Sequence, residues 1–153
     1  MKTKILIVAL VTMCLSACSK TNFNTKPTLE FKSTNSDIYQ RGQIVEFVIK
    51  YTDKEGDIQN NIYLEEVTKD KDCSDNNFSS AEPIPSGVPE KSNAEGEIVI
   101  KYLYGINDPN GVIPTLTGPK CQRNDTCYFK FALTDKANNT SDTVTSPQIV
   151  FVY

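Results

Sequence analysis

The chain has 153 residues, with 16 lysines and arginines against 19 aspartates and glutamates, and it contains no histidine and no tryptophan. This mildly acidic balance excludes the basic footprint of a nucleic-acid-binding protein, so no nucleic acid is expected as a partner. The absence of histidine removes the usual general base near neutral pH and the commonest metal ligand.

The N-terminal residues have the pattern of an export signal. Lys2 and Lys4 precede a short apolar run over residues 5–15, which is shorter than the about 20 residues that cross a bilayer. The run ends at Leu15-Ser16-Ala17-Cys18, which resembles a bacterial lipobox, where the cysteine thiol receives a diacylglycerol. The alternative is an ordinary cysteine after an ordinary cleavage site. We predict cleavage before Cys18 and anchoring to a membrane through lipid on that residue.

The remaining chain is predicted to form one domain. Residues 1–17 are assigned to the signal peptide, 18–26 to the lipidated cysteine and a flexible polar tether, and 27–153 to the folded part. Its length suits a single domain with a sizeable core.

Apolar residues alternate with polar ones along the folded part, which is typical of strands with one buried face. The predicted strands lie around residues 28–32, 45–51, 62–67, 98–104, 127–133 and 149–153. The irregular stretch 70–95 contains three prolines and is compatible with a short edge strand. Six or seven strands without a helix predict an all-β, antiparallel β-sandwich of the immunoglobulin or fibronectin type III kind, with a β-barrel as the alternative.

Two segments resemble a known family. YTDKEGDI at residues 51–58 is similar to the YTDGDGDIG segment of small envelope lipoproteins from Bacteroidota, and DKANNTS at residues 135–141 is similar to their DRALNKSN-like segment. The resemblance implies an immunoglobulin-like lipoprotein of the outer membrane and implies no activity. Lys54 and Gln59 make the first segment less acidic than in the family. No acidic residue follows Cys18 closely, so the side of the membrane that the protein faces stays open.

Acidic residues occur in two loops that an immunoglobulin-like topology places at one end. Asp53, Glu55 and Asp57 follow the second predicted strand, and Asp135 follows the strand at 127–133. Calcium prefers six to eight oxygen ligands, mainly carboxylates and carbonyls. We therefore predict a calcium site formed by these four residues, against the alternative of solvated turns.

Three cysteines remain after Cys18. Cys73, Cys121 and Cys127 are expected together at one end of the sandwich, and an oxidising envelope permits any of the three pairings. We favour Cys121–Cys127, which closes a short loop; three reduced cysteines are the alternative.

The favoured function is a non-catalytic binding or accessory module with a protein or glycan ligand. Tyr39, Tyr63 and Tyr128 are candidate rings for stacking on sugars, although tyrosines at strand spacing also serve as core. The alternative is a structural or assembly subunit that pairs at a sheet edge. A carboxylate-based hydrolase is disfavoured, because the adjacent Glu65 and Glu66 must point to opposite faces of a strand.

Overall fold

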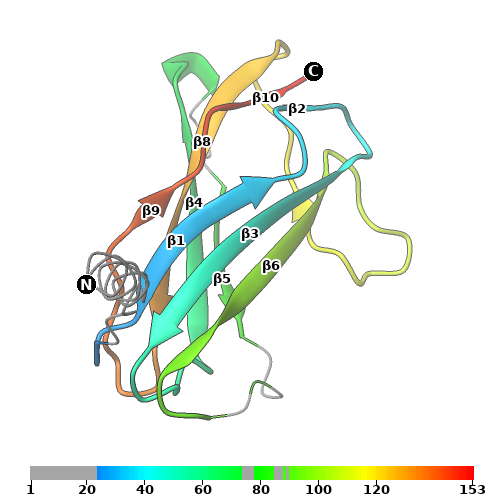
Figure 1. Cartoon of the computed structure of the whole chain (residues 1–153). Coiled ribbons are helices and arrows are strands. Elements are labelled where there is room, and N and C mark those ends of the chain that lie inside the picture. The colour runs from blue at the N-terminus through cyan, green and yellow to red at the C-terminus, as the bar shows by residue number, and fades with distance from the viewer. Residues whose placement is uncertain (1–23, 74–77, 85–87, 89) are drawn as a thin grey trace, which may run out of the picture.

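The computed structural model describes residues 24–73, 78–84, 88 and 90–153. They form two packed sheets (Figure 1). The first sheet has the order β1 (Thr28–Thr34), β3 (Ile44–Asp53), β6 (Ala94–Tyr104) and β7 (Thr115–Leu116). The second has the order β2 (Ile38–Tyr39), β10 (Ile149–Phe151), β8 (Asp125–Thr134), β4 (Asn61–Thr68) and β5 (Ser79–Pro83), with β9 (Val144–Thr145) also paired to β8.

This topology confirms the predicted all-β, immunoglobulin-like sandwich. All six predicted strands are present as β1, β3, β4, β6, β8 and β10. The described residues contain ten strands rather than six or seven, because β2, β5, β7 and β9 are short additions. The sheets are also not wholly antiparallel, since β2 runs parallel to β10 and β7 runs parallel to β6. The stretch 70–95, which was compatible with a short edge strand, contains β5. This strand lies at the edge of the second sheet and ends at Pro83.

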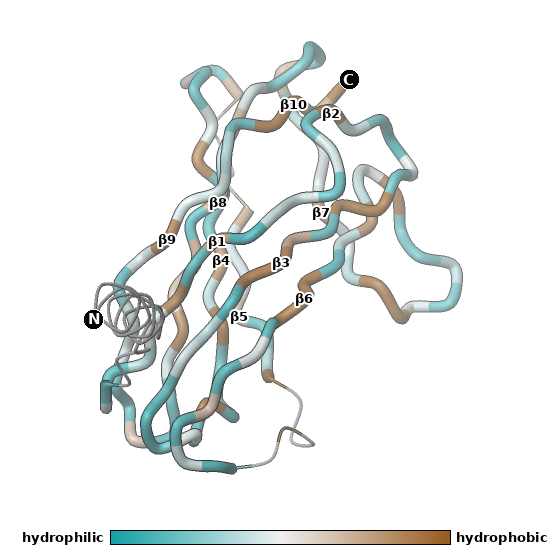
Figure 2. Tube along the Cα trace, viewed as in Figure 1, coloured by the Kyte–Doolittle hydropathy of each residue, from teal (hydrophilic) through white to brown (hydrophobic). Residues whose placement is uncertain are grey.

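Alternation along the strands builds the core between the sheets. On β3, Val45, Phe47 and Ile49 are fully buried, as expected for alternate residues of a strand with one buried face. Figure 2 shows hydrophobic stretches along the paired strands β3 and β6. The Phe47 ring lies 4.9 Å from the ring of Phe129 on β8, measured between centroids, so the two sheets contact through aromatic side chains. Burial of these rings is the main force that holds the sheets together.

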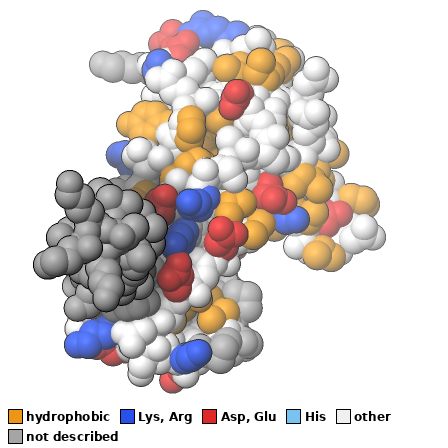
Figure 3. All heavy atoms as spheres, in the orientation of Figure 1, with side chains coloured by type: hydrophobic (Ala, Val, Ile, Leu, Met, Phe, Trp, Pro, Cys, Tyr) orange, Lys and Arg blue, Asp and Glu red, His pale blue; other side chains and the backbone are white. Residues whose placement is uncertain are grey.

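The outer face of the first sheet carries mixed charges. Figure 3 shows lysines interspersed with acidic residues over this face. The ion pairs are Lys32–Glu30, Lys50–Glu95 and Lys101–Glu46. Exposed pairs of this kind contribute about 0–1 kcal/mol each, so this face is best described as a solvated surface.

The chain enters the sandwich at the end that carries the β3–β4 and β8–β9 connections (Figure 1). Thr28 at the start of β1 pairs with Thr52 near the end of β3. Lys54 N–H donates to the Asn24 carbonyl at 3.1 Å, so contacts with the domain begin before the predicted boundary at Pro27. Within the described ranges, no helix is long and apolar enough to span a bilayer.

Candidate functional site

Three of the four predicted calcium ligands converge at the entry end of the sandwich. One carboxylate oxygen from each of Asp53, Asp57 and Asp135 lies within 4.8 Å of the others. We call these residues the aspartate cluster. Glu55 is exposed and does not belong to this group, so the predicted set of four is reduced to three.

The β3–β4 loop is folded around the first of these carboxylates. Asp53 Oδ2 accepts hydrogen bonds from the backbone N–H of Gly56 at 2.5 Å and of Asp57 at 3.2 Å. Gly56 has a positive φ of 74°, and a Cβ there would lie 2.1 Å from the carbonyl oxygen of Lys91. The tight turn therefore requires glycine, and it brings Asp57 back beside Asp53.

Asp135 reaches the cluster from the loop between β8 and β9. Its carboxylate accepts hydrogen bonds from Asn139 N–H at 2.7 Å and Asn139 Nδ2 at 2.9 Å. Two further bonds join the loops: Lys136 N–H donates to the Asp57 carbonyl at 2.9 Å, and Asn60 Nδ2 donates to the Asp135 carbonyl at 2.9 Å. Hydrogen bonds within and between the two loops therefore hold the three aspartates together.

The cluster concentrates negative charge in a buried place. Asp53 and Asp135 are fully buried. Two ionised carboxylates at the 4.8 Å limit of the cluster repel by about 3.5 kcal/mol at an effective dielectric of about 20. Burial raises the pKa of Asp53; the two backbone N–H groups oppose this effect, and the charges of Asp57 and Glu55 add to it. An all-oxygen set of this kind suits a hard cation such as calcium or magnesium.

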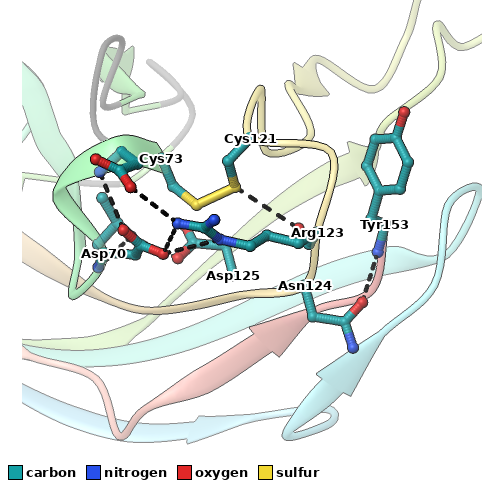
Figure 4. The surroundings of a disulfide bond; sticks show 9 residues. Asp70, Cys73, Cys121, Arg123, Asn124, Asp125 and Tyr153 are labelled. Atoms are coloured by element: carbon teal, nitrogen blue, oxygen red, sulfur yellow. Dashed lines mark hydrogen bonds and ion pairs between the residues drawn. A yellow bond between two sulfur atoms is a disulfide. The ribbon is translucent and has the colours of Figure 1, made fainter.

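The disulfide at the other end corrects the predicted pairing. Cys73 is bonded to Cys121, with their Cα atoms 4.9 Å apart (Figure 4), so the predicted Cys121–Cys127 bridge is wrong. Cys127 is a free thiol on the inward face of β8 and is fully buried. Cys121 lies in the loop that precedes β8, and its partner Cys73 is the last residue of the 3₁₀ turn Lys71–Cys73. Period-two geometry points Cys127 into the core, away from that loop.

Ion pairs between exposed residues also link the two loops that the disulfide joins. Arg123 Nε donates to Asp70 Oδ2 at 3.0 Å, and its guanidinium also pairs with Asp72 at 3.3 Å (Figure 4). The Arg123 guanidinium lowers the pKa of the Asp70 carboxyl. The loop of Asp70 and Asp72 is therefore tied to the loop that follows Cys121.

Sequence reasoning did not single out a buried acidic pair beneath the disulfide. Glu66 shares the inward face of β4 with Ile62 and Leu64 and is only 8% exposed. Burial raises its pKa to about 7, and its carboxyl shares a hydrogen bond with Cys127. Asp125, 3% exposed, lines the same small cavity of about 20 Å³, room for about one water molecule. The period of β4 was a sufficient signal, because Glu66 has the parity of the apolar residues.

A larger hollow lies on the outer face of the second sheet, with a volume of about 570 Å³. We call it the Tyr63 groove. It is lined by Tyr63, Leu64, Glu65, Ser79, Ser80, Ala81, Lys130, Phe131, Ala132 and Thr143.

Tyr63 is the exposed aromatic residue of the groove, whereas the Phe131 side chain is buried. Tyr63 is 45% exposed, and its cross-strand neighbours are Ala81 on β5 and Ala132 on β8. Both cross-strand neighbours are small, so neither is able to cover the ring fully. Next along the sheet, Lys130 Nζ and Glu65 Oε2 are 3.7 Å apart.

The other two candidate tyrosines have different positions. Tyr39 is 1% exposed and belongs to the core. Tyr128 is half-buried and does not line the groove. Cys18, the predicted lipidation site, lies outside the described residues, as does the signal peptide.

Comparison with known proteins finds only distant structural similarity. No family model matches the chain, and no curated protein matches it. Among solved structures, the chain is similar to the sporulation control protein Spo0M from Bacillus subtilis, with 14% identity over 84% of this chain and a TM-score of 0.43; it spans 50% of that protein.

Two further structures resemble it to a similar degree. A Niemann-Pick type C2 protein from the Japanese carpenter ant has 9% identity, a TM-score of 0.42 and coverage of 85% of this chain and 98% of its own. The CARDB domain of the PF1109 protein from Pyrococcus furiosus, in complex with di-metal ions, has 12% identity, a TM-score of 0.35 and coverage of 90% and 97%. Identities and scores of this size carry no argument about function.

Proposed function

We propose that this protein is a lipid-anchored envelope lipoprotein whose β-sandwich binds a saccharide chain, without catalysis, in the Tyr63 groove. The observation that carries the proposal is the exposed Tyr63 ring between two alanines in a hollow of about 570 Å³. A flat ring with open sides stacks on the apolar face of a sugar.

Polar groups beside the ring supply the hydrogen bonds that a sugar requires. Ser79 and Thr143 line the groove with hydroxyls, and Glu65 and Lys130 offer a charged acceptor and donor. Such a mixture of one aromatic platform and a few polar side chains is typical of a ligand site. Its lining residues come from three neighbouring strands, β5, β4 and β8, and this breadth favours a chain over a compact small molecule.

The proposed lipid anchor orients the domain relative to the membrane. Cys18 is six residues before Asn24, whose carbonyl is already bonded to Lys54, so the intervening chain spans at most about 20 Å. With lipid on Cys18, the aspartate cluster lies at the membrane-proximal end. The groove is on the side of the sandwich, where a polymer is able to approach. The outer membrane is the proposed location.

An assembly subunit is the second candidate, and one observation favours it. Among the described residues, no strand pairs with the outer edge of β6 from Ala94 to Tyr102, because β7 covers only Leu103 and Tyr104. An open edge is able to accept a strand from another protein. Glu95, Glu97 and Lys101 are exposed on this strand, however, and charges of this kind oppose edge pairing. We therefore prefer the binding module.

Catalysis is not proposed for the groove. Among the described residues, Glu65 is the only acidic one that lines the groove, whereas hydrolysis of a glycoside normally uses two facing carboxyls. Glu66 points to the opposite face, as the strand geometry predicts, and its small cavity admits no substrate.

Binding is tested on an array of neutral and acidic oligosaccharides with the purified protein in detergent. We expect retention of at least one saccharide class, and a loss of at least tenfold in affinity in Tyr63→Ala. Ala132→Trp, which fills the groove while leaving Tyr63 in place, is expected to lose binding as well.

Tyr128→Ala is the matched control, because Tyr128 lies on the same outer face but outside the groove. Its binding is expected to stay within twofold of the wild type. Equal losses in Tyr63→Ala and Tyr128→Ala, or no retained saccharide, would contradict the proposal.

The anchor is tested separately by localisation. Cys18→Ser is expected to release the protein from the membrane fraction, and metabolic labelling with a fatty acid is expected to mark the wild type only. A Cys18→Ser protein that stays in the membrane fraction would contradict lipid anchoring. Protease treatment of intact cells then decides the face: degradation places the protein outside, and protection places it in the periplasm.

A further inference from the structure

We propose that the aspartate cluster binds one calcium ion that links the β3–β4 loop to the β8–β9 loop. This site is separate from the Tyr63 groove, so each proposal stands or fails by itself. The cluster is formed by Asp53, Asp57 and Asp135.

Unused ligand atoms in a buried place are the first reason. Asp53 is fully buried, yet its Oδ1 accepts no hydrogen bond from any described group. Asp57 Oδ1 is also buried and has no donor. Buried carboxylate oxygens in folded proteins normally have a partner, and one without a donor among the described groups calls for an explanation such as a bound ion or water. A cation shared by both oxygens satisfies them together.

The charge balance is the second reason. None of the ion pairs among the described residues involves a member of the cluster. Lys26 pairs with Asp142, and Lys136 of the β8–β9 loop pairs with Glu90, so neither of these two lysines pairs with the cluster. Three neighbouring carboxylates without a lysine or arginine are the arrangement that a divalent cation stabilises.

The spacing of the oxygens favours calcium over magnesium. Two oxygens bound to one calcium ion at 2.3–2.6 Å are separated by at most about 4.6–5.2 Å, and two bound to magnesium at 2.0–2.1 Å by at most about 4.0–4.2 Å. The cluster oxygens lie within 4.8 Å of one another, a limit inside the span of calcium and beyond that of magnesium. Water completes the six to eight ligands that calcium takes.

The scaffold is already built for such an ion. Two hydrogen bonds hold the loops together at 2.9 Å each, from Lys136 N–H to the Asp57 carbonyl and from Asn60 Nδ2 to the Asp135 carbonyl. Gly56 fixes the turn that faces Asp57 toward Asp53. The ion therefore meets aspartates that are held in position, and it adds a link between two loops at the end where the tether enters.

The test is calorimetric titration of calcium, and separately of magnesium, into the purified protein after removal of metals with EDTA, together with thermal melts. We expect one calcium per chain and weaker binding of magnesium. At a free calcium concentration one hundred times the Kd, the melting temperature is expected to rise by about 10 °C for a domain of this size.

Two variants with the same change of charge separate a site from a general charge effect. Asp57→Asn is expected to weaken calcium binding at least tenfold, and to melt in EDTA at or above the temperature of the wild type, because a like charge has been removed. Glu55→Gln changes the same loop by the same charge, but Glu55 is exposed and outside the cluster, so its affinity is expected to stay within twofold.

Several results would overturn the assignment. If millimolar calcium produces no heat of binding and no shift in melting temperature, the assignment is refuted. A preference for magnesium over calcium refutes it as well. Equal losses in Asp57→Asn and Glu55→Gln would show a diffuse charge effect. A lower melting temperature of Asp57→Asn in EDTA, with calcium affinity unchanged, would assign Asp57 a purely structural role.

Discussion

Replacing Cys73 and Cys121 together by alanine is expected to lower the free energy of unfolding by about 4 kcal/mol. The bridge joins residues 48 positions apart. In the chain-entropy description, a closed loop of that length removes about 14 cal/mol/K from the unfolded state, or about 4 kcal/mol at 25 °C. Stabilities of single domains are about 5–15 kcal/mol, so this loss is a large share of the total.

Urea denaturation followed by circular dichroism measures the effect, with and without a reducing agent. The wild type is expected to lose stability on reduction, and the double variant is expected to be insensitive to it. Cys127→Ala is the control: it removes the buried free thiol, and the response to reduction should persist, because Cys127 is not part of the bridge.

Two results would refute this reasoning. A wild type whose unfolding free energy changes by less than about 1 kcal/mol on reduction would show that the bridge does not constrain the unfolded chain. A crosslinked peptide containing Cys127, found by mass spectrometry of the unreduced protein, would show that the pairing itself is different.

Three other changes give measurable outcomes. Burial raises the pKa of Glu66 from its ordinary 4.5 to about 7, so the folded protein holds a proton more tightly there than the unfolded chain, and wild-type stability should fall as pH rises from about 4.5 to about 7. Glu66→Gln removes this loss, so urea melts above pH 7 should find the variant more stable than the wild type by up to about 3 kcal/mol, with no difference near pH 4. If the unfolding free energies of the two proteins differ by the same amount at every pH, the pKa of Glu66 is not raised. Gly56→Ala should destabilise by about 2 kcal/mol or more, because the added Cβ meets the Lys91 carbonyl oxygen at a positive φ, and a melt equal to the wild type would mean that the turn adopts another shape. Phe47→Ala should cost about 3–5 kcal/mol from the lost aromatic contacts between the sheets, and a cost below about 1 kcal/mol in a urea melt would place that ring outside the core.

The positions of the main strands along the chain could be predicted from the local alternation of apolar and polar residues. On β3 and β8, every second residue is mostly apolar, and the structure buries that set on both strands, with Asp53 and Asp125 as its acidic members. The short strands β2, β7 and β9 have two residues each, so no period exists to detect. They are strands only because a longer neighbour supplies their hydrogen bonds.

The aspartate cluster was partly predictable. Topology alone brings the loop after β3 and the loop after β8 to one end, which explains why Asp53, Asp57 and Asp135 meet. It does not say which way each side chain points. Glu55 lies between Asp53 and Asp57 in the sequence, yet the turn at Gly56 leaves it exposed.

The sequence by itself determined the sandwich, the end at which the acidic loops meet, and the opposite faces of Glu65 and Glu66, because each of these depends on a repeat of two residues or on chain order. Only the tertiary structure decided that Cys73 bonds Cys121 and that the ring of Tyr63 stands in a groove. The disulfide pairing and the groove both depend on distances between segments that are far apart in the chain. Such distances are set by the packing of the whole domain, which local sequence patterns do not encode.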